Sequence, residues 1–125
     1  MSQQNLAGNL IAHGYDVVGY VNGEALVGDP ALSSEHAGGR YYFANEANKA
    51  RFDENPARFA PAYGGWCAFA MSEGKRFDID PRNFKIVDGR LLLFYDGVGG
   101  RTIDFWNQDE TSRLQKADAN WRNGV

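Results

Sequence analysis

The sequence predicts an α+β fold: a small, mainly antiparallel sheet of two hairpins plus one strand, covered by three or four helices. Two dipeptides with a strong turn preference, Asn22-Gly23 and Asp88-Gly89, each separate two apolar runs, as expected for the turns of two β-hairpins. The 125 residues are 43% hydrophobic and 14% aromatic, a composition typical of a globular chain with a ring-rich core. A chain of this length is expected to form one domain.

The first half of the chain is expected to contain a hairpin over 15–29, a further strand and a helix. The strand signal is "GRYYFA", residues 39–44, whose aromatic residues on both faces suit a central strand. This strand leads into a helix that has Asn45 as its N-cap and Glu46 in its first turn, and that continues to about Phe52.

The second half is expected to contain short helices and a second hairpin. Pro56 follows a capping asparagine and starts a short helix, which Pro61 ends. Residues 80–84, "DPRNF", have the same cap-then-proline order and predict a single helical turn, after which 84–95 form the hairpin. Thr102 can cap a closing segment that is either one long amphipathic helix or two shorter ones. No internal repeat is evident from the residues.

The charge pattern excludes several classes of partner. The net charge is −3, and no run of lysine or arginine offers a surface for a phosphate backbone, so nucleic acid is not an expected partner. The N-terminal stretch has neither a basic start nor a long apolar run, which predicts no membrane insertion and a cytoplasmic protein, or a periplasmic one if a signal peptide was removed. The single cysteine excludes an intramolecular disulfide.

Four motifs, taken in their order and spacing, resemble the YHS-domain proteins in their small stand-alone bacterial branch. They are "GYDVVGYVNGEALVG", "SSEHAGGRYYFANEANKARFDENPARFAPAYGGWCAFAMSEG", "DPRNFKIVDGRLLLFYD" and "KADANW". The likeness runs from about Gly14 to Trp121, so it implies that residues 1–125 form one YHS-like domain. It also implies a binding or accessory role, because YHS domains are associated with the handling of heavy metals.

The metal-linked branch of that family carries cysteines at the junction between its aromatic strand and the following helix, and near its first strand. Here Ala44 and Asn48 occupy the places at the junction, and Gly19 or a neighbour occupies the place near the first strand. None of these side chains supplies the thiolate that a soft metal ion prefers. A metal ion would instead need Cys67, with His13 and His36, to form a mixed site for copper or zinc.

Cys67, in "YGGWCAFAM", has three interpretations. Free cysteine is among the most buried residue types and packs as a small hydrophobe. If Trp66 opens a helix, Cys67 lies in its first turn, where backbone N–H groups favour a reactive thiolate. As a metal ligand, Cys67 would combine with the two histidines and a carboxylate such as Asp16.

A small-molecule pocket is a further hypothesis. Aromatic side chains with polar tips commonly line such pockets and orient the ligand. Alternation along "RYYFA" predicts that its two tyrosines face opposite sides of the strand, so one of them can reach a pocket. The residues expected to line it are Tyr15, Asp16, Tyr42, Tyr63, Trp66 and Cys67.

Three functions of different classes follow from these residues. The leading one is a non-catalytic YHS-type binding or accessory domain that holds a small molecule or a metal ion near Cys67, and it predicts a concavity that reaches this residue. The second is a thiol-dependent enzyme or redox-active protein, which needs a base within hydrogen-bond reach of Cys67. The third is a structural or interaction module, which includes a homodimer, with an exposed aromatic patch and no ligand.

Overall fold

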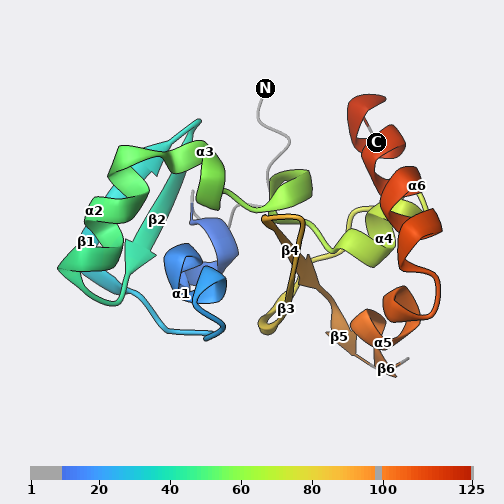
Figure 1. The fold of residues 1–125 in the computed structure, drawn as a ribbon, viewed down its shortest axis with the longest axis horizontal. Coiled ribbons are helices and arrows are strands. Elements are labelled where there is room, and N and C mark those ends of the chain that lie inside the picture. Colours follow the sequence, from blue (N-terminus) through green and yellow to red (C-terminus); the bar gives the residue numbers. More distant parts are fainter. Residues whose placement is uncertain (1–9, 98–99, 125) are drawn as a thin grey trace.

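The computed structural model describes residues 10–97 and 100–124 (Figure 1). These residues form an α+β fold, which confirms the predicted class. The strands pair only within hairpins, so they make three separate two-stranded antiparallel sheets. In chain order the elements are η1 (Ile11–Gly14), α1 (Val17–Val21), β1 (Asp29–His36), β2 (Gly39–Phe43), α2 (Glu46–Glu54), α3 (Pro56–Phe59), η2 (Ala62–Gly65), α4 (Ala68–Ser72), β3 (Asp80–Val87), β4 (Arg90–Phe94), β5 (Asp96–Gly97), β6 (Gly100–Arg101), α5 (Thr102–Asn107) and α6 (Glu110–Arg122).

Several elements lie where the sequence predicts them. Strand β2 coincides with the aromatic "GRYYF" run. Helix α2 begins after Asn45, whose side chain accepts the N–H of Asn48 as an N-cap. Pro56 is the first residue of α3, where its missing N–H is not needed. The second hairpin turns at Asp88 and Gly89 between β3 and β4, and the closing segment is two helices, α5 and α6.

The predicted hairpin over 15–29 is wrong, because this segment begins with a helix. The carboxylate of Asp16 accepts the N–H groups of Val18 and Gly19, which caps α1 and draws the β-branched residues after it into a helical turn. The turn-forming pair Asn22 and Gly23 then ends this helix instead of joining two strands. Side-chain capping thus overrides the strand preference of valine.

Residues 80–84 also differ from their prediction, since they begin strand β3 instead of forming a helical turn. A proline as the second residue of a strand is tolerated at a sheet edge, where its ring displaces no ladder hydrogen bond. Thr102 is likewise not the cap of α5 but its first residue, and its hydroxyl donates to the carbonyl of Tyr95. Strand β1, which the sequence does not signal, pairs with β2.

The chain contains an internal structural repeat that the residues alone do not reveal. Each half has a 3-10 turn, a five-residue helix and a long hairpin, in the order η1–α1–β1–β2 and then η2–α4–β3–β4. The two hairpins share one register, including a bulge after the first pair: Asp29 pairs with Phe43 and Asp80 with Phe94. Equivalent positions lie 51 residues apart (29 to 80, 43 to 94).

The backbone geometry repeats as well. In the two 3-10 turns, Ala12 and His13 of the first half and Tyr63 and Gly64 of the second all have φ between 53° and 61°. Left-handed backbone is costly for residues with a Cβ atom, so its recurrence at matching places indicates that the same surroundings impose it twice.

A buried acceptor at the N-cap of the short helix joins helix and hairpin in each half. In the first half, Asp16 Oδ2 accepts the N–H of Ala44, the residue that follows β2, at 2.9 Å. In the second half, Cys67 Sγ accepts the N–H of Tyr95, the residue that follows β4, at 3.2 Å. Both acceptors are fully buried. Cys67 therefore occupies the structural position of Asp16.

The helix that follows each hairpin adds a polar side chain to the same acceptor. Asn48 of α2 donates its Nδ2 hydrogen to Asp16 at 2.8 Å, and Thr102 of α5 places its Oγ1 3.6 Å from Cys67 Sγ. A carboxylate can accept several hydrogen bonds at once, whereas a thiol is a weak acceptor. The first half is thus held more tightly at this point than the second.

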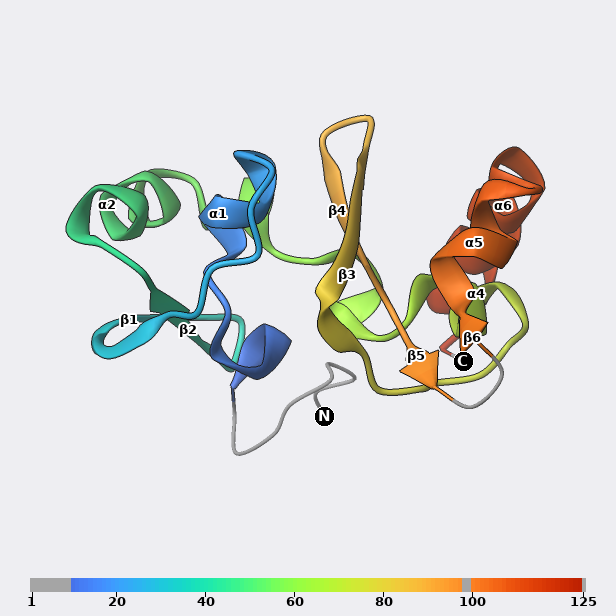
Figure 2. The ribbon, with the colours of Figure 1, turned by 90° about the horizontal axis from the view of Figure 1, so that it is seen from below.

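The two halves lie side by side. In both views α2 and the first hairpin are at one end of the molecule, α5 and α6 are at the other, and the β3–β4 hairpin stands between them (Figures 1 and 2). Across this junction the ring of Tyr20 packs on Phe84 with centroids 4.7 Å apart, and its hydroxyl donates to the carbonyl of Pro81. The junction is therefore a packed interface, with Tyr20 at its centre.

Replacing the first acceptor should cost far more stability than replacing an exposed carboxylate. In Asp16→Asn, one carboxylate oxygen becomes an NH2 group and can no longer accept from buried donors, so the free energy of unfolding should fall by about 3 kcal/mol. Urea denaturation measures this loss. The control is Asp53→Asn, whose exposed carboxylate accepts from Ser34 and Lys49 and should lose less than about 1 kcal/mol. Equal losses of unfolding free energy in Asp16→Asn and Asp53→Asn would contradict the role of Asp16 as a buried structural acceptor.

Candidate functional site

Cys67 is enclosed by protein on all sides. Its thiol is fully buried, accepts the N–H of Tyr95 and contacts the hydroxyl of Thr102. Its backbone N–H donates to the carbonyl of Phe77. The residue is the N-cap of α4, and its side chain makes no capping bond to that helix. These contacts support the interpretation of Cys67 as a buried packing residue that also serves as an acceptor.

The two histidines lie in other surroundings. His13 places its Nε2 2.8 Å from Asp78 Oδ1, and His36 packs edge-on against the ring of Phe52 with centroids 6.2 Å apart. Within residues 10–97 and 100–124, no three histidine, cysteine, aspartate or glutamate side chains are grouped so that they could hold a metal ion. The structure thus does not gather Cys67, His13 and His36, and a metal site built on them stays a prediction.

The six residues predicted to line one ligand pocket are dispersed. Asp16 is a buried structural acceptor, Tyr42 packs beside Gly14, and Trp66 packs against the core. Tyr15 and Tyr63 each line a cavity, but not the same one. The sequence therefore identifies single cavity residues and does not identify a shared site.

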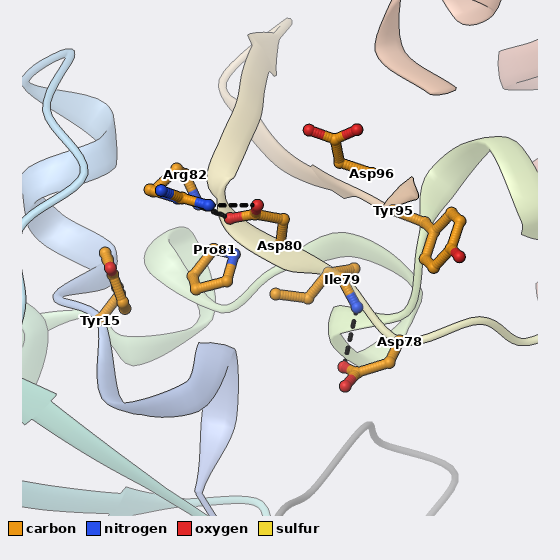
Figure 3. A pocket seen from close by; sticks show the side chains of 8 residues that line it. All are labelled: Tyr15, Asp78, Ile79, Asp80, Pro81, Arg82, Tyr95 and Asp96. Atoms are coloured by element: carbon orange, nitrogen blue, oxygen red, sulfur yellow. Dashed lines mark hydrogen bonds and ion pairs between the residues drawn. The ribbon is translucent and has the colours of Figure 1, made fainter. Parts of the chain in front are cut away.

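The cavity that Tyr15 lines has an acidic wall. Figure 3 shows Tyr15 on one side of this view and Tyr95 on the other, with Asp80 and Arg82 between them. Its volume is about 470 Å³. Arg82 forms an ion pair with Asp80 at 2.9 Å and holds the pKa of that carboxyl below its usual value. The charge of Asp80 is therefore already compensated within the protein.

An apolar groove of about 380 Å³ lies next to Cys67. Two of its lining residues, Tyr95 and Thr102, are the residues that contact the Cys67 sulfur. Two ring pairs flank it, Phe69 with Phe105 at 5.9 Å and Phe77 with Tyr95 at 5.7 Å between centroids. Cys67 itself does not line this groove. The sequence does not indicate that these three phenylalanines share a groove, because Phe69 and Phe77 lie in and just after α4 whereas Phe105 lies in α5, far along the chain.

A third cavity, of about 560 Å³, is lined by residues of both halves and by Trp121 of α6. Beside it, the hydroxyl of Tyr63 donates to Asp118, and Arg90 binds the same carboxylate through both terminal nitrogens, at 2.8 and 3.2 Å. Burial opposes ionisation of Asp118, but the bonds from Arg90 and Tyr63 outweigh it and hold its pKa below the usual value. Arg90 is thereby fixed in one orientation.

Comparison of the chain with protein-family models, with curated proteins and with solved structures finds no match. Among the described helices, none combines the length and the apolar character that crossing a membrane requires.

Two buried tyrosines should respond in opposite ways to loss of the hydroxyl. The hydroxyl of Tyr41 is buried and has no hydrogen-bond partner among the described residues, so Tyr41→Phe should raise the free energy of unfolding by about 1 kcal/mol. Tyr63→Phe removes the bond to Asp118 and should lower it by about 1 kcal/mol. Denaturant unfolding at pH 7 compares them, and a loss of stability in Tyr41→Phe would contradict the first assignment.

The wild-type protein and Tyr41→Phe should also differ in the pH dependence of their stability. Burial raises the pKa of Tyr41 from 10.0 to about 12, so between these values the unfolded chain releases a proton that the native state keeps. The contribution of Tyr41 to stability is complete below pH 10 and falls as the pH rises towards 12. Stability of Tyr41→Phe should therefore decline less steeply over this window than that of the wild-type protein, and parallel declines would be the contrary result.

Proposed function

We propose that the chain is a non-catalytic binding domain of the YHS type that holds a small, apolar ring compound in the groove beside Cys67. The observation that carries this proposal is the exposure of two large rings at one groove: 45% of Phe77 and 44% of Phe105 are exposed to solvent. Apolar surface in water costs about 25 cal/mol per Å². A molecule that lies between the rings removes this cost and displaces water from both.

The polar groups of the groove support a neutral ligand. The hydroxyl of Thr102 donates to the carbonyl of Tyr95 and is already satisfied. Glu73 pairs with Arg113 at 3.3 Å. Apart from Lys75, which also lines the groove, the faces left for a ligand are those of aromatic rings, which favour a flat, apolar partner in tilted or edge-on contact.

Binding is favoured over thiol chemistry by the surroundings of Cys67. A nucleophilic thiolate needs a base within hydrogen-bond reach and access for the substrate. The Cys67 sulfur is fully buried behind Tyr95 and Thr102, while His13 and His36 contact Asp78 and Phe52 instead. Cys67 thus supports the floor of the groove and does not face a ligand in it.

A neutral fluorescent dye, Nile red, tests the groove. We expect saturable binding with a Kd of about 10 μM, weakened about tenfold by Phe105→Ser and by Phe77→Ser because each removes a ring face from the ligand. The control is Val27→Ser, which removes the third exposed large apolar side chain away from the groove and should leave the Kd unchanged.

Two outcomes would overturn this proposal. If Val27→Ser weakens dye binding as much as the groove variants do, or if the groove variants do not weaken it, the dye binds elsewhere. If Phe105→Ser instead converts a dimer into a monomer in light scattering, the groove is an interface between copies of the chain, as in the homodimer hypothesis.

A further inference from the structure

The cavity between the two halves is lined by five separate elements and shares no residue with the apolar groove. His36 comes from the end of β1, Arg58 from α3, Tyr63 from η2, Arg90 from the start of β4 and Trp121 from α6. Its volume of about 560 Å³ is within the range of small-molecule sites. Such sites commonly form where two structural units meet.

The charges around this cavity are one-sided. Arg58 and Arg90 line it, and no carboxylate belongs to its lining. Arg58 packs over the ring of Phe59 at 5.5 Å and forms no ion pair with a described residue. Arg90 forms an ion pair with Asp118, which does not belong to the lining. Of the two arginines, only Arg90 is paired with a described acid, Asp118, so the cavity carries excess positive charge and favours an anion.

Arg90 is prepared to bind an acceptor. Its bidentate contact with Asp118 uses one N–H of each terminal nitrogen, and a guanidinium carries five N–H groups. Its charged centre also lies 5.5 Å from the centroid of the Tyr63 ring. Because these contacts fix the side chain before a ligand arrives, binding costs little side-chain entropy.

Apolar and aromatic groups surround the two arginines. The rings of Trp121, Tyr63 and His36 and the small side chains of Ala60, Ala62 and Pro61 also line the cavity. A simple inorganic anion would leave these surfaces uncovered. A planar body attached to the charge would bury them and gain the hydrophobic contribution as well.

We propose that this cavity binds a small aromatic carboxylate, with the carboxylate at Arg58 and Arg90 and the ring against Trp121. The site goes beyond the proposed function, because it takes an anion and the apolar groove takes a neutral molecule. The N–H groups of Arg90 that Asp118 does not use, together with the guanidinium of Arg58, can donate to the carboxylate.

Phenylacetate is the probe, and phenylacetamide is its neutral match. In 15N NMR titration of the full chain, phenylacetate should bind with a Kd of about 1 mM and shift the amides of Gly64 and Gly89 and the indole N–H of Trp121. Phenylacetamide should bind about fivefold more weakly, because an exposed ion pair contributes about this much. Added salt should weaken the binding of phenylacetate, because it screens the charges.

Two arginines that flank the same ring make a matched pair of variants. Arg51 and Arg58 lie 5.6 and 5.5 Å from the ring of Phe59, but only Arg58 lines the cavity. Arg58→Gln should weaken phenylacetate about fivefold, whereas Arg51→Gln should change its Kd by less than about twofold. Arg58 is exposed and unpaired with any described acid, so its replacement is not expected to unfold the protein.

Several results would overturn the proposal. If phenylacetamide binds with the same Kd as phenylacetate, the negative charge of the ligand does not contribute to binding. If Arg58→Gln and Arg51→Gln weaken phenylacetate binding equally, Arg58 has no specific part in the site. If inorganic phosphate binds as tightly as phenylacetate, the aromatic surfaces take no part. Shifts confined to Phe77 and Phe105 would place the probe in the apolar groove, which would support the proposed function and reject this site.

Discussion

The fold depends on one buried hydrogen-bond acceptor in each half, placed between a five-residue helix and the end of a hairpin. A helix this short is not stable by itself, because the cost of its first turn is not recovered over so few residues. Asp16 and Cys67 each accept the N–H of the residue that follows the second hairpin strand, Ala44 or Tyr95. In each half this contact ties the start of the short helix to the end of the second hairpin strand.

Both candidate sites lie near the second anchor, Cys67. The apolar groove lies directly outside the second anchor, because Tyr95 and Thr102 contact Cys67 on one side and line the groove on the other. The cavity between the halves forms where η2, which precedes Cys67, passes the turn of the second hairpin near Gly89. Cys67 is therefore linked to the groove through its contacts with Tyr95 and Thr102.

The sequence predicts the elements whose signals are local and misses what depends on contacts distant in the chain. Asn45 as a cap and Asp88-Gly89 as a turn were identifiable because their role depends on neighbouring residues. The apolar run after Asp16 predicts a strand, whereas the observed helix depends on a buried carboxylate that accepts four hydrogen bonds, two of them from residues distant in the sequence. The repeat is hidden for a similar reason. Between the halves, identity is confined to three pairs of glycines with positive φ (Gly14 and Gly65, Gly23 and Gly74, Gly38 and Gly89), to the buried Phe43 and Phe94, and to Asp29-Pro30 and Asp80-Pro81. Each of these aspartates accepts the backbone N–H two residues on.

The most direct test of the two-anchor account is native-state hydrogen exchange at the amides of Ala44 and Tyr95. Both N–H groups donate to a fully buried side chain, so both should exchange only through large-scale opening and rank among the most protected amides. Because a thiol is the weaker acceptor, Tyr95 should be somewhat less protected than Ala44. Exchange of Tyr95 at the rate of an exposed loop amide would contradict the claim that Cys67 anchors the second half.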